Sequence, residues 1–490
     1  MPALVMLGSG LWGLDRGGMW RDEAVTFQVA RRTVPQIWRL LHDVDAVHGL
    51  YYLLMHAVLP LHPGEVVLRL PSVCAAALTA GLVAELGARL IRPRAGLWAG
   101  LLYAVSPMAG HYAQEGRSYA LVAAGATAAT LLFVRAARED GSWRMYGAVL
   151  GLTCWLHEFA VLLLLAHAAS LALARAGVAV WRSWGCAAGA VVLALLPMAL
   201  VSHAQSAQLA WLRPPTAATA QGLLRTFLGP TDGVYGTCLA LAAVGLAGLV
   251  ARRGGLTCAG VCLPLAVLPP AVLMLASQLS PLYVDRYVLY ALSGAPLLVA
   301  AGADRVARVL ARPRVRLPAP VVTASGAALV VFAAVHQFPL LSADRVPAHR
   351  PDDLAAVARA AAHPTAPGEA VLFLPATERN VALTYPGPFR GARDVALAVP
   401  GPASGTLYGR ETGAAALRER MAGFDRVWVV ADRNLLTGRR RTGSPVERAK
   451  LDLLARRFVP VRESVSGDMT VRLYVRGPRS AAAGAPGVRP

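Results

Sequence analysis

The sequence is poor in charge. Only 16% of its 490 residues are Asp, Glu, Lys or Arg, while 56% are hydrophobic. A soluble globular chain is about half apolar and about a quarter charged. The apolar excess lies in long runs that end near residue 340, and such runs are typical of membrane spans. The composition therefore excludes an ordinary soluble protein and predicts a polytopic α-helical membrane protein.

Several familiar signatures are missing. The sequence has no glycine-rich phosphate loop, no repeat period, and no cysteine spacing typical of a metal site or a disulfide framework. The first apolar stretch, residues 2–14, lacks a basic leader and an Ala-x-Ala cleavage site, which favours a short first helix over a signal peptide. The six cysteines lie in or beside apolar runs and are expected to be small buried hydrophobes. They are Cys74, Cys154, Cys186, Cys238, Cys258 and Cys262.

The apolar runs predict about eleven transmembrane helices. The segments are 2–14, 71–91, 95–110, 119–134, 145–160, 161–174, 185–201, 237–251, 257–276, 288–303 and 319–338. Arginines gather in alternate connections, at 89–94, 135–144, 175–182, 252–253 and 305–316. The positive-inside rule places these connections in the cytoplasm. This distribution also accounts for much of the net charge of +20 without a nucleic-acid-binding patch, so we expect no nucleic-acid partner.

The other face receives the long connections and the C-terminal region. The apolar stretch 50–62 has only about thirteen residues, so it is expected to lie at the outer surface instead of spanning. We predict a transmembrane domain over residues 1–340 with an outer loop at 15–70. A second domain, residues 341–476, is expected outside the cytoplasm, and a Gly-, Ala- and Pro-rich tail, 477–490, is expected to be disordered.

The C-terminal domain alternates helical and strand patterns. Helices are predicted near 354–361, 414–421 and 446–457, the first of them capped by Asp352-Asp353. Strands are predicted at 370–374, 426–431, 459–462 and 470–475. The alternation predicts a soluble α/β domain, which we expect to be a docking or substrate-selecting module and not a second enzyme.

Acidic residues are scarce, and most of those near the membrane fall on the outer side. Asp22 and Glu23 follow the first helix, and an acid pair there would also favour the start of a surface helix. Glu115 could instead form an interfacial ion pair with Arg117. Arg286, beside Asp285, could instead be an interfacial anchor. His48 and the pair His157-Glu158 are each either ligands or satisfied polar groups.

The order of these residues is more specific than any one of them. The chain contains Trp20-x-Asp22-Glu23, Asp45-x-x-His48-Gly49-Leu50-Tyr51-Tyr52, Leu68-Arg69-Leu70-Pro71-Ser72, Ser106-Pro107, Gln114-Glu115-x-Arg117-x-Tyr119 and Asp285-Arg286-Tyr287. This series resembles the bacterial branch of the membrane glycosyltransferases with the GT-C fold. That group is related to the protein O-mannosyltransferases and the lipid A aminoarabinose transferases. The resemblance covers roughly residues 15–340 and is most specific over 20–120.

The resemblance implies a set of site residues. Asp22 corresponds to the acid-base residue of the first outer loop, and Glu115 to the acid of the second. The substrate-binding residues that it implies are Glu23, His48, Arg69, Arg117, Tyr119 and Arg286. Gly49 stands where many members have proline, and Glu115 stands where the aminoarabinose transferases have aspartate. The resemblance therefore leaves open whether a divalent metal is a cofactor, and Asp22 and Glu115 are its candidate ligands.

The function that follows is a polyprenyl-phosphate-sugar-dependent glycosyltransferase of the bacterial plasma membrane. It would move a sugar, with mannose expected, to a protein, lipid or glycan acceptor on the outer face. A carboxylate accepts the proton of the attacking hydroxyl, and arginine suits the leaving phosphate. Two alternatives remain at this point: a transporter or lipid flippase, which would place ionisable residues at mid-membrane depth, and a non-catalytic scaffold for envelope assembly.

Overall fold

The computed structural model describes residues 1–138, 141–247, 249, 255–310, 319–346, 352–362 and 368–477. These residues form two compact units. The first comprises residues 1–16 and 41–349, and the second comprises residues 17–40 and 350–490. The segment 17–40, which carries Asp22 and Glu23, therefore groups with the C-terminal part of the chain. The predicted tail beyond Gly477 and the arginines at 252–253, 312, 314 and 316 lie outside the described residues.

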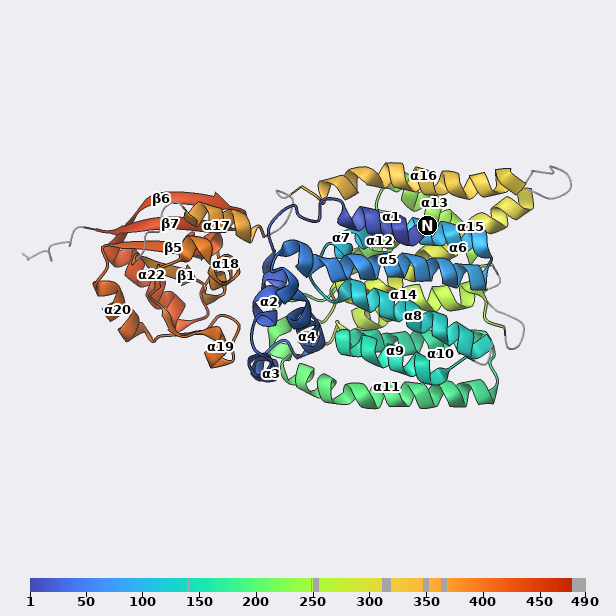
Figure 1. Ribbon diagram of the computed structural model, residues 1–490, viewed down its shortest axis with the longest axis horizontal. Coiled ribbons are helices and arrows are strands. Elements are labelled where there is room, and N and C mark those ends of the chain that lie inside the picture. Colours follow the sequence, from blue (N-terminus) through green and yellow to red (C-terminus); the bar gives the residue numbers. More distant parts are fainter. Residues whose placement is uncertain are drawn as a thin grey trace, which may run out of the picture. The chain divides into compact units, whose positions relative to one another are not determined.

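The first unit is a helical bundle, and each of the eleven predicted spans falls on a helix in it (Figure 1). The helices that correspond to the spans are α1 (Pro2–Leu11), α5 (Glu65–Leu90), α6 (Pro93–Ala104), α8 (Tyr119–Arg138), α9 (Trp143–Leu156), α10 (Leu163–Leu173), α11 (Val178–Ala204), α13 (Asp232–Gly245), α14 (Cys258–Ala276), α15 (Gly294–Leu310) and α16 (Ala319–Ala343). Shorter helices connect them: α4 (Gly49–Val58), α7 (Pro107–Ala113), α12 (Ala217–Leu228) and the 3-10 helices η1 (Ala46–His48), η3 (Glu158–Leu162) and η5 (Asp285–Ser293).

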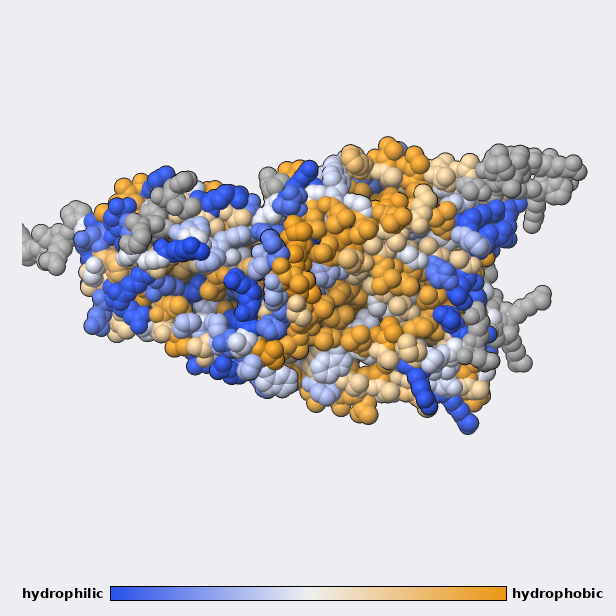
Figure 2. Space-filling view, in the orientation of Figure 1, coloured by the Kyte–Doolittle hydropathy of each residue, from blue (hydrophilic) through white to orange (hydrophobic). Residues whose placement is uncertain are grey.

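The surface of this bundle is suited to lipid. Within the described residues, six helical segments are long and apolar enough to cross a membrane: Glu65–Leu90, Tyr119–Arg138, Val178–Ala204, Cys258–Ala276, Asp285–Leu310 and Ala324–Ala343. On α11, large apolar side chains such as Leu193 and Leu200 are exposed. Hydrophobic residues cover most of the visible face of the bundle (Figure 2). Exposed apolar surface of this extent is unfavourable in water, and the prediction of a polytopic membrane domain is confirmed.

Small residues let the helices approach closely. An added Cβ on Gly302 of α15 would lie 1.8 Å from the carbonyl oxygen of Leu241 in α13. Glycine is therefore required here for backbone contact, which is a common way to pack helices in lipid. The ambiguous stretch 50–62 ends in the 3-10 helix η2 (Leu59–Leu61) and otherwise falls in α4, which has ten residues. At a rise of about 1.5 Å per residue it is about 15 Å long, half the thickness of a bilayer core.

One end of the bundle collects basic loops around a buried acid. Asp304 is fully buried, accepts from Arg94 and from Arg308 at 2.9 Å each, and forms an ion pair with Arg92 at 3.3 Å. Arg138, at the end of α8, donates to the carbonyl oxygen of Arg89 at 3.0 Å. The connections after α5, α8 and α15 thus meet at the same end. This agrees with the alternation of arginines in the sequence.

The second unit contains a five-stranded mixed sheet. Its strands follow the order β2 (Arg393–Asp394), β1 (Ala370–Leu374), β5 (Arg426–Asp432), β7 (Met469–Arg476) and β6 (Phe458–Ser466). β1 is parallel to β2 and β5, while β7 is antiparallel to β5 and β6. A second, two-stranded sheet pairs β3 (Leu397–Val399) with β4 (Arg410–Glu411). The C-terminal α/β domain is therefore confirmed.

Helices surround this sheet. They are α2 (Arg21–Ala30), α17 (Leu354–Ala362), α18 (Asn380–Thr384), α19 (Gly401–Ser404), α20 (Ala414–Ala422), α21 (Arg433–Leu436) and α22 (Pro445–Arg457). Helix α3 (Val34–Asp43) continues the chain into the first unit. Every residue of β1 is buried, so both faces of the sheet are covered at this strand, whereas β6 is mostly exposed. The expected cap is present, because Asp353 Oδ1 accepts from the backbone N–H of Ala356 at 3.0 Å.

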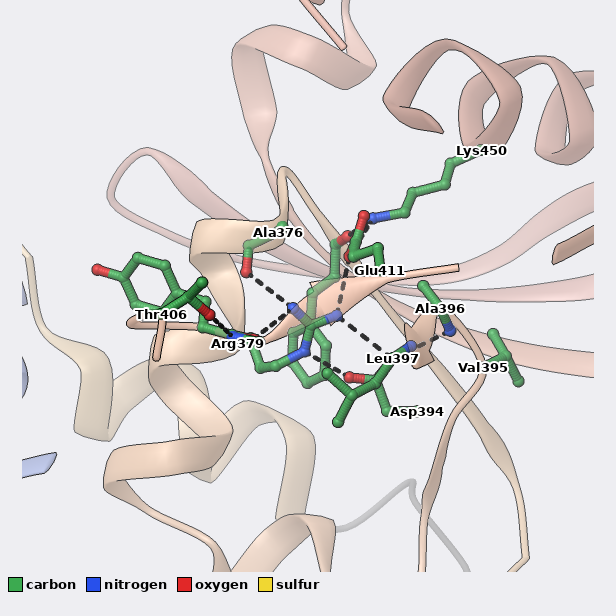
Figure 3. A network of polar contacts seen from close by, with 12 residues as sticks. Ala376, Arg379, Asp394, Val395, Ala396, Leu397, Thr406, Glu411 and Lys450 are labelled. Atoms are coloured by element: carbon green, nitrogen blue, oxygen red, sulfur yellow. Dashed lines mark hydrogen bonds and ion pairs between the residues drawn. The ribbon is translucent and has the colours of Figure 1, made fainter. Parts of the chain in front are cut away.

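A buried ionic network ties the segment after β1 to the rest of the domain (Figure 3). Arg379 donates to Asp394 at 2.6 Å and to Glu411 at 2.8 Å. Lys450 of α22 donates to the same Glu411 oxygen at 2.7 Å and to the carbonyl oxygen of Phe373 in β1 at 2.8 Å. Burial lowers the pKa of Lys450, and Glu411 opposes this shift. Buried charges of this kind are tolerated because each one has ionic and hydrogen-bonding partners.

We predict that Glu411→Ala will destabilise the second unit by about 3–5 kcal/mol, because it leaves the buried Lys450 ammonium without its carboxylate. Hydrogen exchange of the β1 and β5 amides in the full-length protein would measure this loss. Glu463→Ala is the matched control, since its ion pair with Arg472 is more exposed and should contribute less than about 1 kcal/mol. Equal effects of the two variants would contradict a stabilising role for the network.

Candidate active site

The loop between α7 and α8 is held in place by one side chain of α5 and by one of its own. Ser72 of α5 donates to the carbonyl oxygens of Glu115 and Arg117 at 2.6 and 3.1 Å. Gln114 donates to the carbonyl oxygens of Gly10 and Trp12, both at 2.8 Å. These bonds satisfy buried carbonyl groups that the end of a helix leaves unpaired. The loop that carries Glu115 and Arg117 is therefore fixed to both α5 and α1.

Arg69 has a similar structural task. Its side chain is fully buried, and its guanidinium donates to the carbonyl oxygen of Leu14 at 3.0 Å and to that of Arg16 at 3.5 Å. These carbonyls lie just after α1. The geometry thus shows that Arg69 holds the exit of the first helix, while its contact with substrate stays a prediction.

Arg117 contacts His48, a pairing that the sequence did not predict. Arg117 Nη2 lies 2.7 Å from His48 Nε2, and both residues are buried. Arginine has only donors, so His48 Nε2 must accept and the ring proton must lie on Nδ1. That Nδ1 atom is buried and has no hydrogen-bond partner among the described residues. His48 therefore presents a buried N–H donor beside a guanidinium.

Aromatic rings extend this pair toward Arg286. The His48 ring centre lies 6.0 Å from that of His157 and 6.4 Å from that of Tyr119. Arg286 Nε donates to the Tyr119 hydroxyl at 3.1 Å, and its guanidinium carbon lies 5.8 Å from the centre of the Tyr287 ring. His157 Nδ1 is also buried without a partner among the described residues. The four segments η1, 115–119, 157–158 and η5 thus converge on one cluster with two guanidinium groups.

A short turn orients the start of this cluster. Asp45 adopts a left-handed backbone conformation with φ 57°, which is unusual for a residue other than glycine. Its carboxylate accepts from the Tyr52 hydroxyl at 2.8 Å. Tyr52 lies one turn into α4 and its ring centre is 6.1 Å from that of His48. Asp45 and Tyr52 therefore hold η1, and with it His48, against α4.

A pocket opens beside the cluster. It has a volume of about 250 Å³ and is bounded by α7, α12, η5 and the end of α16. Its polar lining includes Tyr112, Asp285, Thr226 and Asp344. The Tyr112 ring centre is 6.0 Å from that of Tyr119, and Asp285 precedes Arg286. The pocket thus offers carboxylates and an aromatic ring next to the two arginines.

The two predicted acids lie in different units. Glu115 is buried in the first unit, in the loop just described. Asp22 lies half-buried in the first turn of α2 in the second unit, followed by the fully buried Glu23. Across the described ranges, no group of three or more His, Cys, Asp or Glu could hold a metal ion. A divalent metal held by Asp22 and Glu115 stays a prediction.

Some residues of the cluster were not among the site residues predicted from the sequence. His157 and Tyr287 both pack into it, with ring centres 4.7 Å apart. The available signals were a histidine at the point where α9 ends and a tyrosine next to Arg286. Ser72 was also omitted, although it follows Pro71 in one of the quoted motifs. The sequence gives no sign that these residues are neighbours, and only the folded chain brings them into contact.

Comparisons with known proteins find one matching family model and several similar structures. The family model described as dolichyl-phosphate-mannose-protein mannosyltransferase matches residues 50–202, which run from α4 to α11. A search of curated protein sequences finds no match. The structure is similar to that of ArnT from Cupriavidus metallidurans in the apo state, with a TM-score of 0.62 and 15% identity over 96% of this chain and 97% of that chain.

Two further solved structures are similar. ArnT from Cupriavidus metallidurans bound to undecaprenyl phosphate has a TM-score of 0.59 and 13% identity, and covers 96% of this chain and 97% of that chain. The Archaeoglobus fulgidus oligosaccharyltransferase in the apo form has a TM-score of 0.53 and 12% identity, and covers 94% of this chain and 72% of that chain. At such identities, the likeness establishes the fold.

Proposed function

We propose, starting from the GT-C fold that the chain shares with these structures, that it is a membrane glycosyltransferase that uses a polyprenyl-phosphate sugar as donor. The observation that carries the proposal is the pair of buried ring nitrogens, Nδ1 of His48 and Nδ1 of His157, that have no partner among the described residues and are flanked by Arg117 and Arg286. A buried N–H group without a protein acceptor is costly unless a ligand supplies one. A phosphate oxygen is such an acceptor, and guanidinium groups complement its charge.

The likeness to known proteins supports the same donor class. One of the similar structures is ArnT bound to undecaprenyl phosphate, and the matching family model is described by dolichyl-phosphate-mannose as donor. Both are lipids with a phosphate head. A donor anchored in the bilayer needs an enzyme with membrane-embedded helices and polar groups at their ends, and the first unit has both. Mannose is the sugar that we propose, on the family description alone.

Asp22 is the proposed base. In the reaction, the acceptor hydroxyl oxygen bonds to the anomeric carbon while the bond from that carbon to the phosphate oxygen breaks. The hydroxyl proton passes to the Asp22 carboxylate, and the bonding electrons leave with the polyprenyl phosphate. Attack opposite the leaving group inverts the anomeric centre. Arg117 and Arg286 stabilise the charge that develops on the phosphate, and the carboxylates of the 250 Å³ pocket provide acceptors for sugar hydroxyl groups.

The orientation follows from the arginines. The basic end of the bundle, around Asp304, faces the cytoplasm in this proposal. The loops that carry His48, Arg117 and Arg286 and the C-terminal domain then lie outside, and sugar is transferred to a protein, lipid or glycan acceptor on that face.

The donor-phosphate assignment predicts that Arg286→Ala will remove most transfer activity. The variant loses a positive charge beside the phosphate and a hydrogen bond to Tyr119. Arg286→Lys should restore little, because an ammonium group does not reproduce the planar fork of donors. Arg225→Ala is the control, since Arg225 is an arginine near a helix end that pairs with the exposed Asp232. Near-normal turnover in Arg286→Ala would reduce this residue to an interfacial anchor.

The base assignment predicts that Asp22→Asn will lower the rate of transfer by about 100- to 10,000-fold, the usual contribution of a general base. Donor binding should change much less, since the phosphate is assigned to the arginines. Initial rates at equal amounts of folded protein would measure the loss.

Two comparisons make this result decisive. Asp425→Asn changes an exposed acid of the same unit and should leave the rate unchanged. If Asp22 and Glu23 only favour the start of α2, then Asp22→Asn and Glu23→Gln will act alike and mildly. An Asp22→Asn enzyme that keeps more than about a tenth of the wild-type rate would remove Asp22 as the base.

The orientation is tested by reporter fusions. A reporter that is active only outside the cytoplasm should be active when it is fused after Val475 and inactive when it is fused at Arg94. The reverse pattern would overturn the topology and, with it, the face on which transfer is proposed to occur.

A further inference from the structure

The helix that carries Asp22 is fastened to the C-terminal domain at both ends. Arg21 donates to Glu378 at 3.0 Å and lies 3.4 Å from Asp352. Two turns later, Gln28 donates to Thr384 at 2.8 Å and to the carbonyl oxygen of Asn380 at 3.2 Å. All of these residues belong to the second unit.

The chain on either side of α2 is fastened as well. The backbone N–H of Met19 donates to the Tyr385 hydroxyl at 2.8 Å, and Arg32 donates to the carbonyl oxygen of Leu407 at 2.9 Å. Gly18 lies so close to α17 that an added Cβ would be 2.6 Å from the Cβ of Ala355. The contacts therefore run along the whole of α2.

The partners of α2 are themselves rigidly held. Glu378, Asn380 and Thr384 are buried in the segment that follows β1. Between Glu378 and Asn380 lies Arg379, which enters the network with Asp394 and Glu411 that Figure 3 shows. Burial raises the pKa of Glu378 to about 7 and Asp352 and Asp432 add to the rise, while Arg21 opposes it. A carboxyl group in such surroundings depends on Arg21 as its partner.

The helix geometry separates the fastening face from Asp22. Arg21 and Gln28 are seven residues apart, which is close to two turns, so both point to the same side of α2. Asp22 follows Arg21 by one residue and is therefore rotated by about 100° from that side. Its side chain stays half-buried while its neighbour is bound to the domain. The contacts can thus fix the position of Asp22 from another side of the helix.

We propose that the C-terminal domain is a positioning element for catalysis: Arg21 and Gln28, bound to Glu378, Asp352, Asn380 and Thr384, fix the helix that presents Asp22. This inference rests on the proposed function. It gives the domain a task other than the docking or substrate selection expected from the sequence. A catalytic group must be held closely, since a misplacement of about 1 Å can cost about 100-fold in rate.

The test uses the full-length protein with Arg21→Ala and Gln28→Ala, alone and combined, and Glu463→Ala as the control at an ion pair of the β6–β7 edge. Hydrogen exchange of the peptide that covers residues 19–32 reports on the helix. Transfer kinetics report on the chemistry. In the combined variant we expect at least tenfold faster exchange in this peptide, unchanged exchange in β1 and β5, and a kcat at least tenfold lower at a similar donor KM.

Further variants separate positioning from simple loss of structure. Glu378→Ala added to Arg21→Ala should lower kcat little further, because the two residues act through one contact. Arg21→Lys should recover part of the rate, since it keeps a charge for Glu378. The control should match the wild type in both readouts.

Two results would overturn the inference itself. One is unchanged exchange over residues 19–32 in the combined variant, which would mean that these contacts do not hold α2. The other is faster exchange over residues 19–32 in the combined variant together with a wild-type kcat, while Asp22→Asn is inactive. That result would mean that Asp22 needs no such positioning. A wild-type rate in Asp22→Asn would instead remove the base assignment on which the inference rests, and the two kinds of failure are therefore distinguishable.

Discussion

The hydrocarbon of a bilayer supplies no hydrogen-bond partner, so polar groups inside it must find their partners within the protein. This constraint determines where the polar groups of this molecule lie. In the helical unit, charged groups meet at helix ends and in the loops between them. Asp304 gathers three arginines at one end, while Arg117, His48 and Arg286 lie in the loops that form the candidate site. Polar groups confined to loops are suited to a reaction at the membrane surface, where a lipid-borne phosphate and a water-soluble acceptor can meet.

The same constraint explains why so many of the motif residues bind backbone. A loop between two spans leaves carbonyl groups that must be satisfied without water. Ser72, Gln114 and Arg69 do this for the loop at 115–117 and for the exit of α1. Ser72 and Gln114 fix the backbone from which Glu115 and Arg117 extend, and Arg69 fixes the exit of α1.

The sequence predicted most of what local patterns determine. The eleven apolar runs fall on helices, and the α/β elements of the C-terminal domain lie close to their predicted ranges. The residues of the candidate site were mostly named in advance, because they occur in ordered motifs. The contacts between them were not predictable: His48 meets Arg117 across 69 residues, and Arg21 meets Glu378 across 357. Such pairs depend on how the chain folds back on itself, which periodicity and propensity do not encode.

The central claim is that this chain transfers a sugar from a lipid-linked donor. The direct measurement incubates membranes that contain the protein, and matched membranes without it, with a radiolabelled polyprenyl-phosphate sugar or the corresponding radiolabelled nucleotide sugar. The account predicts a labelled, inverted product only with the lipid-linked donor and only when the protein is present. Direct transfer from the nucleotide sugar in the absence of the lipid carrier, or no transfer from any polyprenyl-phosphate sugar with well-folded protein, would contradict it.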